Sequence, residues 1–401
     1  MVELSGPAAT PTTGYPALFR AFIANNLAFV LADVQTRTAL TEEQRREGLA
    51  ALEYGLAEPH TRTKAIALLL ALAPHMLGAG LREAWQPFLE RGLALAPDAV
   101  SAGEIAYHLG NIAQFQGRFA QAEDHFADSA VDLARAGALG KHARSLNRLA
   151  FVLRHRQRHA EAQALALQAL GLLDRREPEW GYSHFVLGAV AFDQQADQAA
   201  VEHLQTALGC WEAHGDDEHR ADGLVNLAPA LRRVQRYDEA IVALQEAGHL
   251  YAGRRDPRRQ GLVQLNLSNI HLSQARWEEA LACCREAEPL FRQVGDRLHQ
   301  AINHNNMGVA CRRLQRLEQA ERLFLLAIGA LENFDQPRHH ANALDGLGNT
   351  YRDGGRIPEA AAAYRQALAR LARAPDPAAL QQLAEEVRGH LAGLPAGGDR
   401  E

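Results

Sequence analysis

Asparagine and arginine recur in this sequence at intervals of 40 residues or multiples of 40. A carboxamide carries hydrogen-bond donors and an acceptor, so a row of asparagines can hold the backbone of an extended peptide. A guanidinium group takes a carboxylate in a planar, two-pronged geometry, so arginines beside such a row favour an acidic peptide. The two series are Asn226, Asn266 and Asn306 and, six positions further along the same interval, Arg232, Arg312 and Arg352.

The interval belongs to a repeat that spans most of the chain. Each copy has an alanine, here called the anchor, that follows a leucine or methionine by thirteen positions and precedes a second small residue by seven. Residues seven apart lie on one helix face, so small side chains there let two helices approach closely. One helical pair cannot bury such a face alone, so the copies must stack into an all-α solenoid. The anchors are Ala122, Ala162, Ala200, Ala240, Ala280, Ala320 and Ala360.

This repeat resembles the tetratricopeptide repeat in its longer form of about 40 residues. The clearest copy reads Leu347-Gly348-Asn349-Thr350-Tyr351, and copies from Leu109 and Met307 share its frame. The resemblance covers about residues 101–372. The repeat is similar to those of polarity-scaffold and kinesin-light-chain proteins and of bacterial sensor regions attached to signalling ATPases. The resemblance implies a right-handed superhelical solenoid with N- and C-terminal capping helices.

In proteins of this family, positions −1, +2 and +5 from the leucine or methionine line a concave groove that binds peptides. We therefore expect the groove over the fourth to seventh repeats to hold a partner's segment, with an acidic part toward the C-terminal repeats. The first three repeats place Phe151, Ala189 and Phe192 at such positions and predict a more apolar half. The candidate peptide-binding residues are Asn226, Asn266, Asn269, Asn306, Asn349, Arg232, Arg312 and Arg352.

Alternatives for these residues stay open. The asparagines could bond one helix to another or only face water, and the arginines could be solvated turn residues. A carboxylate clamp of the chaperone-adaptor type is incomplete, because Leu265, Asn342 and Gly346 stand where it needs basic residues.

The chain divides into five predicted segments. Residues 1–14 are expected to be a disordered tail, 15–100 an N-terminal helical cap with a degenerate repeat, and 101–372 the seven repeats. Residues 373–394 should form a C-terminal capping helix that precedes a tail at 395–401. Residues 15–100 could equally be a separate functional module. Within them, Thr41 and Gln44 form the capping-box pattern that starts a helix.

Composition excludes several classes of function. The net charge of −6 and the pI near 6.3 lack the basic balance of a nucleic-acid-binding protein. No secretory signal is recognisable, and the stretch Ala65–Ala73, taken as the most apolar, is too short to cross a bilayer. The cysteines form no C-x-x-C pair, which indicates a reducing compartment. We therefore expect a cytoplasmic protein that binds no membrane.

Catalytic and metal-binding motifs are not recognisable in the sequence. The densest histidine groups, at 155–159 and 339–340, lie beside arginines, whose charge opposes metal binding. The first functional hypothesis is a non-enzymatic protein-interaction scaffold without a cofactor. The alternative is a stand-alone sensor or regulatory module that controls a separate effector, such as a signalling ATPase, a transcription regulator or a caspase-like protease. A third hypothesis places an enzyme site in residues 15–95. The sequence leaves the partner and the oligomeric state open.

Overall fold

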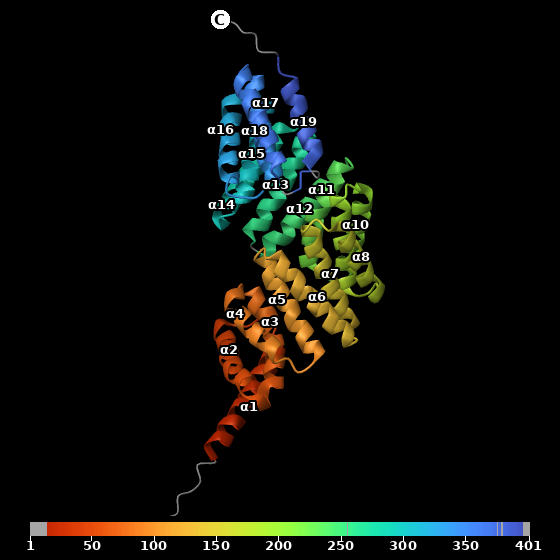
Figure 1. The fold of residues 1–401 in the computed structure, drawn as a ribbon, viewed down its shortest axis with the longest axis vertical. Coiled ribbons are helices and arrows are strands. Elements are labelled where there is room, and N and C mark those ends of the chain that lie inside the picture. The colour runs from red at the N-terminus through yellow and green to blue at the C-terminus, as the bar shows by residue number, and fades with distance from the viewer. Residues whose placement is uncertain (1–13, 255, 375, 378–379, 396–401) are drawn as a thin grey trace, which may run out of the picture. The chain divides into compact units, whose positions relative to one another are not determined.

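The computed structural model describes residues 14–254, 256–374, 376–377 and 380–395. Within these ranges the chain forms helices and no strand, which confirms the predicted all-α class (Figure 1). The predicted tails lie almost wholly outside the described residues. The helices are α1 (Gly14–Gln35), α2 (Glu42–Ala57), η1 (Pro59–Thr61), α3 (Arg62–Gly78), α4 (Arg82–Ala94), α5 (Ala99–Phe115), α6 (Phe119–Arg135), α7 (Leu139–His155), α8 (His159–Leu172), α9 (Pro178–Asp193), α10 (Asp197–His214), α11 (Asp217–Arg233), α12 (Tyr237–Arg254), α13 (Pro257–Ser273), α14 (Trp277–Val294), α15 (Arg297–Arg313), α16 (Leu317–Leu331), α17 (Pro337–Asp353), α18 (Ile357–Ala372) and α19 (Gln381–Ala392).

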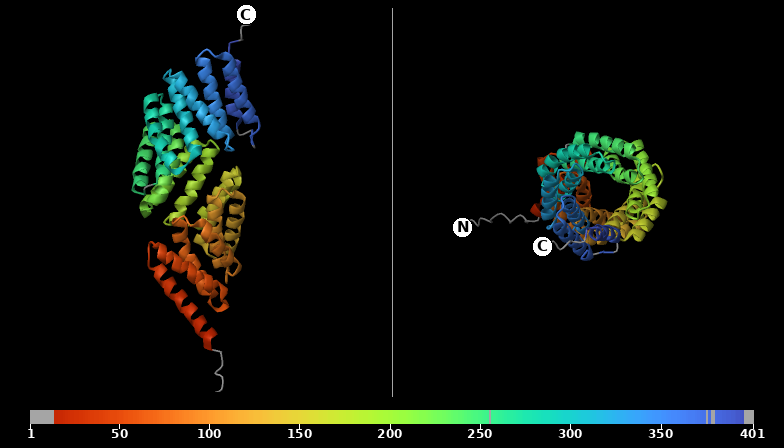
Figure 2. Two further views of the ribbon diagram at one scale, coloured as in Figure 1. Left: turned by 90° about the vertical axis from the view of Figure 1, so that its left-hand side faces the viewer. Right: turned by 90° about the horizontal axis from the view of Figure 1, so that it is seen from above.

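The chain groups into two compact units, Met1–Val190 and Ala191–Glu401, and each is described by itself. Unit 1 contains α1 to α8 and most of α9, and unit 2 contains the helices from α10 onward. Within each unit, helices that follow one another in the chain pack side by side (Figure 2).

Helices α5 to α18 alternate as A and B helices, so that α5, α7, α9, α11, α13, α15 and α17 are the A helices. Every anchor alanine lies in a B helix and is 0% exposed. The glycine after the repeat's leucine also permits close packing, because a Cβ at Gly348 would lie 2.5 Å from the ring of Tyr364. The small residues bring paired helices together, and the chain is an all-α repeat solenoid, as predicted.

Aspartates start several of the A helices. The carboxylates of Asp98, Asp216, Asp256 and Asp296 each accept a hydrogen bond from the backbone N–H three residues on, at 2.8 to 3.2 Å. Such N-caps satisfy amides that have no partner within the helix. The linkers between repeats thus set where the next A helix begins.

The turn from A helix to B helix uses one left-handed residue in every repeat. It lies five positions before the anchor and has φ between 58° and 75°. Gly117 and Gly355 occupy it in the first and last repeats, but Ala275 and four glutamines occupy it elsewhere. A side chain in this conformation costs about 1–2 kcal/mol. Sequence reasoning missed this position, because most of its residues carry a Cβ.

The N-terminal helices form their own core in unit 1. Ile23 and Leu27 of α1 share this core with Leu52 of α2 and Leu69 of α3, and all four are at most 4% exposed. The predicted capping box is present at the start of α2. Whether residues 15–100 act as a cap or as a separate module stays a prediction.

Helix α1 is a longer apolar segment than the stretch at 65–73, and the sequence analysis did not single it out. Residues Ala17–Gln35 are long and apolar enough to cross a membrane by length and composition alone, and 22% of that stretch is buried. The sequence reading overlooked it because Arg20, Asn25 and Asn26 break the apolar residues into short runs.

Candidate functional site

One side of the A helices in unit 2 carries all eight predicted binding residues. In α11, Asn226 and Arg232 are partly exposed, whereas Leu227 and Leu231 are buried. Spacings of three and four residues keep such positions on one side of a helix. We call this surface the A-helix stripe. Its members are Asp222, Val225, Asn226, Pro229, Arg232, Leu262, Leu265, Asn266, Asn269, Leu272, Ile302, Asn305, Asn306, Val309, Arg312, Asn342, Asp345, Gly346, Asn349 and Arg352.

The asparagines of the stripe differ in what they bond. The Nδ2 of Asn306 donates to the Oδ1 of Asn269 at 2.8 Å and to the Oγ of Ser268 at 3.0 Å, which links α15 to α13. Asn226 donates to the backbone carbonyl four residues earlier at 2.8 Å. Asn266 is partly exposed, and its side chain bonds none of the residues that the structure describes. Asn306 therefore bonds helix to helix, while Asn266 retains its donors and its acceptor.

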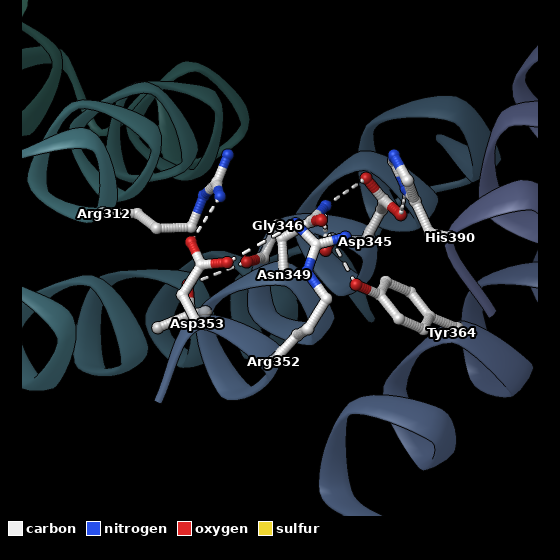
Figure 3. A network of polar contacts seen from close by, with 9 residues as sticks. Arg312, Asp345, Gly346, Asn349, Arg352, Asp353, Tyr364 and His390 are labelled. Atoms are coloured by element: carbon white, nitrogen blue, oxygen red, sulfur yellow. Dashed lines mark hydrogen bonds and ion pairs between the residues drawn. The ribbon is translucent and has the colours of Figure 1, made fainter. Parts of the chain in front are cut away.

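The arginines of the stripe also differ. The Nη1 of Arg312 lies 2.6 Å from one oxygen of Asp353, and an Nη2 of Arg352 lies 3.4 Å from the other, so two guanidiniums share one carboxylate (Figure 3). Arg232 instead donates to the Oγ of Ser273 at 3.1 Å, and burial lowers its pKa. No described carboxylate lies within ion-pair distance of Arg232, so an incoming carboxylate would meet a charge that is not yet neutralised.

A polar network holds the C-terminal helix against the last repeat (Figure 3). The carboxylate of Asp345 accepts a hydrogen bond from Asn349 at 2.9 Å and lies 2.7 Å from the Nδ1 of His390 in α19. The hydroxyl of Tyr364 donates to the Oδ1 of Asn349 at 3.2 Å. Burial raises the pKa of Asp345, and the contact with His390 opposes this shift. Asn349 is 6% exposed. Its Nδ2 donates to Asp345, and its Oδ1 accepts from Tyr364, so both ends of the amide are bonded within the chain.

A small hollow lies beside the part of α11 that precedes Arg232. Its volume is about 130 Å³, and its lining includes Asp222, Asn226, Tyr251, Arg258 and Arg259. The hydroxyl of Tyr251 donates to Asp222 at 2.6 Å, and Arg259 lies 3.1 Å from the same carboxylate. Burial is the main reason that the pKa of Tyr251 is raised. Two guanidiniums thus lie next to Asn226, and both are ion-paired, Arg259 with Asp222 and Arg258 with Asp296 at 2.8 Å.

Sequence reasoning missed the acidic partners of the stripe. Asp345 and Asp222 lie two and five positions before the repeat's leucine, so the same frame that located the asparagines could have found them. Asp353 and Ser273 lie six positions after it. Their pairing with Arg312 and Arg232 joins residues that are 41 positions apart, which no local pattern shows.

The more apolar half expected over the first repeats stays a prediction, and α5 and α7 in unit 1 also carry polar side chains that bond to one another. Arg148 donates to the hydroxyl of Tyr182 at 2.7 Å and to that of Tyr107 at 3.3 Å. Burial acts to lower the pKa of Arg148, but the two tyrosines hold it above its usual range. Beside it, Arg144 donates to Glu104 at 2.7 Å. These residues lie one, two and five positions before the repeat's leucine, and of these positions the sequence analysis considered only the first.

Comparisons with known proteins agree with this architecture. A family profile described as tetratricopeptide repeat matches residues 260–333 and 301–373, and a second with the same description matches 142–172. The chain therefore carries tetratricopeptide repeats over residues 142–172 and 260–373. No curated protein sequence matches it. Among the residues that the structure describes, no three His, Cys, Asp or Glu side chains gather where a metal ion could bind.

Solved structures of low sequence identity share the fold. A Rap protein complexed with competence and sporulation factor has a TM-score of 0.57 at 14% identity, over 92% of this chain and 99% of that one. A signal-transduction ATPase with a tetratricopeptide-repeat sensor from Pyrococcus horikoshii has 0.60 at 13%, over 87% and 55%. Aspartyl phosphate phosphatase F from Bacillus subtilis has 0.55 at 12%, over 99% of both chains. The chain spans about half of the ATPase. At these identities the similarity shows the fold alone.

Proposed function

We propose that the chain is a non-enzymatic protein-interaction module that binds an extended, acidic segment of a partner on the A-helix stripe of unit 2. The observation that carries this proposal is that each of two neighbouring helices, α11 and α13, has a polar side chain that is available to a ligand. Asn266 is without a partner among the described residues, and no described carboxylate pairs with Arg232. An extended peptide has backbone groups for the amide and, where acidic, a carboxylate for the guanidinium.

The proposal narrows the predicted binding residues. Asn306 and Asn349 are 6% exposed and bond within the chain, so they support the surface more than they meet a ligand. Arg312 and Arg352 already share Asp353. We therefore place the first contacts of a ligand at Asn266, Asn269, Asn226 and Arg232, and keep the remaining residues of the prediction as the edge of the site.

The test starts from a random dodecapeptide phage library selected on the full-length protein. Selected peptides should be enriched in acidic residues, and their affinity should be measured by calorimetry at two salt concentrations. Asn266→Ala should weaken binding about 2- to 10-fold, since one hydrogen bond is worth roughly 0.5–1.5 kcal/mol. Arg232→Glu should weaken binding more and reduce its dependence on salt.

Matched controls are Asn333→Ala and Arg322→Glu, because both residues are exposed and lie outside the stripe. They should leave affinity unchanged. If Asn266→Ala and Arg232→Glu bind the selected peptides like the unmodified protein, with unchanged circular dichroism, the stripe is not the site.

A second candidate function is a sensor or regulatory module for a separate effector, such as a signalling ATPase, a transcription regulator or a caspase-like protease. It is supported by the similarity to a tetratricopeptide-repeat sensor region in a signal-transduction ATPase. A scaffold should show hydrogen-exchange protection by the peptide only near α11 and α13. A sensor should also change exchange in helices of unit 1, because it has to transmit binding to an effector.

A further inference from the structure

Helix α1 is apolar on two opposite sides. One side carries Ile23, Leu27 and Val30, which are at most 8% exposed and pack into the core of unit 1. On the opposite side Phe22 is 65% exposed and Phe29 is 73% exposed. Figure 2 shows α1, in red, as the end helix of its unit. A helix that is apolar all round is normally covered on every side.

The exposed side forms one continuous stripe. Leu18, Phe22, Asn25 and Phe29 follow one another at spacings of four, three and four residues, which places them on one face. Leu18 is 69% exposed. Asn25 is also exposed and lies at the centre of the stripe. We call these four residues the outer stripe of α1.

A lipid surface suits this stripe poorly. Helices that lie on membranes carry lysines and arginines along their polar face. Between positions 17 and 32 of α1 the only charged residue is Arg20. A membrane span is also disfavoured, because the inner side of α1 packs into the core of unit 1. Leu27 sits so close to Gly55 of α2 that a Cβ at Gly55 would lie 2.7 Å from it.

We propose that the outer stripe of α1 pairs with the same stripe of a second copy of this chain. A two-fold interface brings the same patch of both copies together. An asparagine within an apolar helix seam suits such a pairing, because its donors and acceptor can meet their own copies, and it fixes register. Asn25 lies three residues after Phe22 and four before Phe29, so a two-fold axis at Asn25 surrounds the amide pair with aromatic rings.

The size of the stripe sets the expected strength. An aromatic side chain carries about 150–250 Å² of surface. With Phe22 65% and Phe29 73% exposed, the two rings present on the order of 300 Å² per copy. With Leu18 and the neighbouring alanines, the surface buried on the two copies together comes near about 1,000 Å². This is the lower end of the area that specific interfaces bury. We expect a reversible dimer with a Kd on the order of 10–100 μM.

The first experiment is sedimentation velocity of the full chain from about 1 to 300 μM, a range that spans the expected Kd. The unmodified protein should shift from monomer to dimer over this range. Phe22→Glu and Phe29→Glu should each weaken the dimer at least about tenfold, because they place a charge in the seam. Both side chains are exposed, so circular dichroism should stay unchanged. Val131→Glu is the control, because Val131 is a singly exposed valine of α6 at 58%.

The second experiment locates the axis. Asn25→Cys, in a background with Cys283→Ser, should form an intermolecular disulfide under mild oxidation, and the exposed Ala57→Cys should not. A protein that stays monomeric at every concentration overturns the proposal, as does a dimer that survives both Phe→Glu changes. Flotation with phosphatidylcholine and phosphatidylglycerol vesicles completes the test. Vesicle binding by a protein that is monomeric in solution would assign the stripe to a membrane instead.

Discussion

Helix α12 carries a glycine that lines a hollow in unit 2. The hollow has a volume of about 410 Å³ and is lined by Gly248 and Leu244 of α12, Val263 and Leu267 of α13, and Leu290 of α14, among others. Gly248 lies eight positions after the anchor. Other repeats have Leu208, Ile328 and Leu368 at this position. The hollow thus lies where those repeats place an aliphatic side chain, and Gly248→Leu should fill it.

The magnitude follows from three terms. Replacing a glycine within a helix gains about 1 kcal/mol from backbone propensity. Half-burying a leucine side chain gains about 1 kcal/mol, and ordering it costs about 0.5–1 kcal/mol. A Cβ at Gly248 would lie 3.6 Å from the Cγ1 of Val263, which is ordinary contact, so no strain offsets the gain. We expect Gly248→Ala to stabilise by about 1 kcal/mol and Gly248→Leu by about 1–1.5 kcal/mol.

Urea unfolding followed by circular dichroism measures the change, and hydrogen exchange of α12 and α13 places it. Gly261→Ala of α13 is the matched control, because its Cβ would lie 2.7 Å from the ring of Phe291. That substitution should destabilise by about 1–3 kcal/mol through overpacking. If Gly248→Leu is no more stable than Gly248→Ala, the hollow does not accept the side chain and the reasoning fails.

Further predictions concern the turn, the anchor and the pH dependence. Ala275→Gly should raise the urea midpoint by the equivalent of about 1 kcal/mol, because Ala275 has φ 58°; an unchanged midpoint would contradict the strain. Ala320→Trp should cost at least about 1–3 kcal/mol and increase hydrogen exchange in both neighbouring repeats; unchanged melting would mean that the repeat frame is wrong. The hydrogen bond from His304 is the main cause that lowers the pKa of Glu288 to about 2. The stabilisation that the ionised carboxylate of Glu288 contributes, on the order of 2–3 kcal/mol, should be complete above pH 4.5 and lost as pH falls toward 2. Glu288→Gln should flatten this loss in urea titrations across pH, and a pH dependence equal to that of the unmodified protein would exclude the bond.

The sequence by itself determined the repeat and its helices. The anchors could be found because each helix pair packs against the next in the same way, so the same small residue is needed at the same position every time. The fully buried alanines, such as Ala280 and Ala320, follow from this local rule. Helix starts followed for the same reason, since an N-cap such as Asp256 bonds a backbone amide only three residues away.

Tertiary structure alone decided which polar groups remain available. Asn266 and Asn306 have the same residue type and the same position in the repeat, yet Asn306 bonds Asn269 of the preceding repeat. Whether an amide is free depends on the side chain that the neighbouring helix presents, about 40 residues away. A hydrogen bond over that distance leaves no periodic signal in the sequence.

The two apolar sides of α1 show the same limit. Leu27 and Phe29 are both apolar residues at helical spacing, and the sequence does not distinguish the one that is buried from the one that is exposed. The difference arises because α2 and α3 cover only one side of the helix. Burial is a property of the packed helices together, so only the tertiary structure decided which residues were left for another molecule to cover.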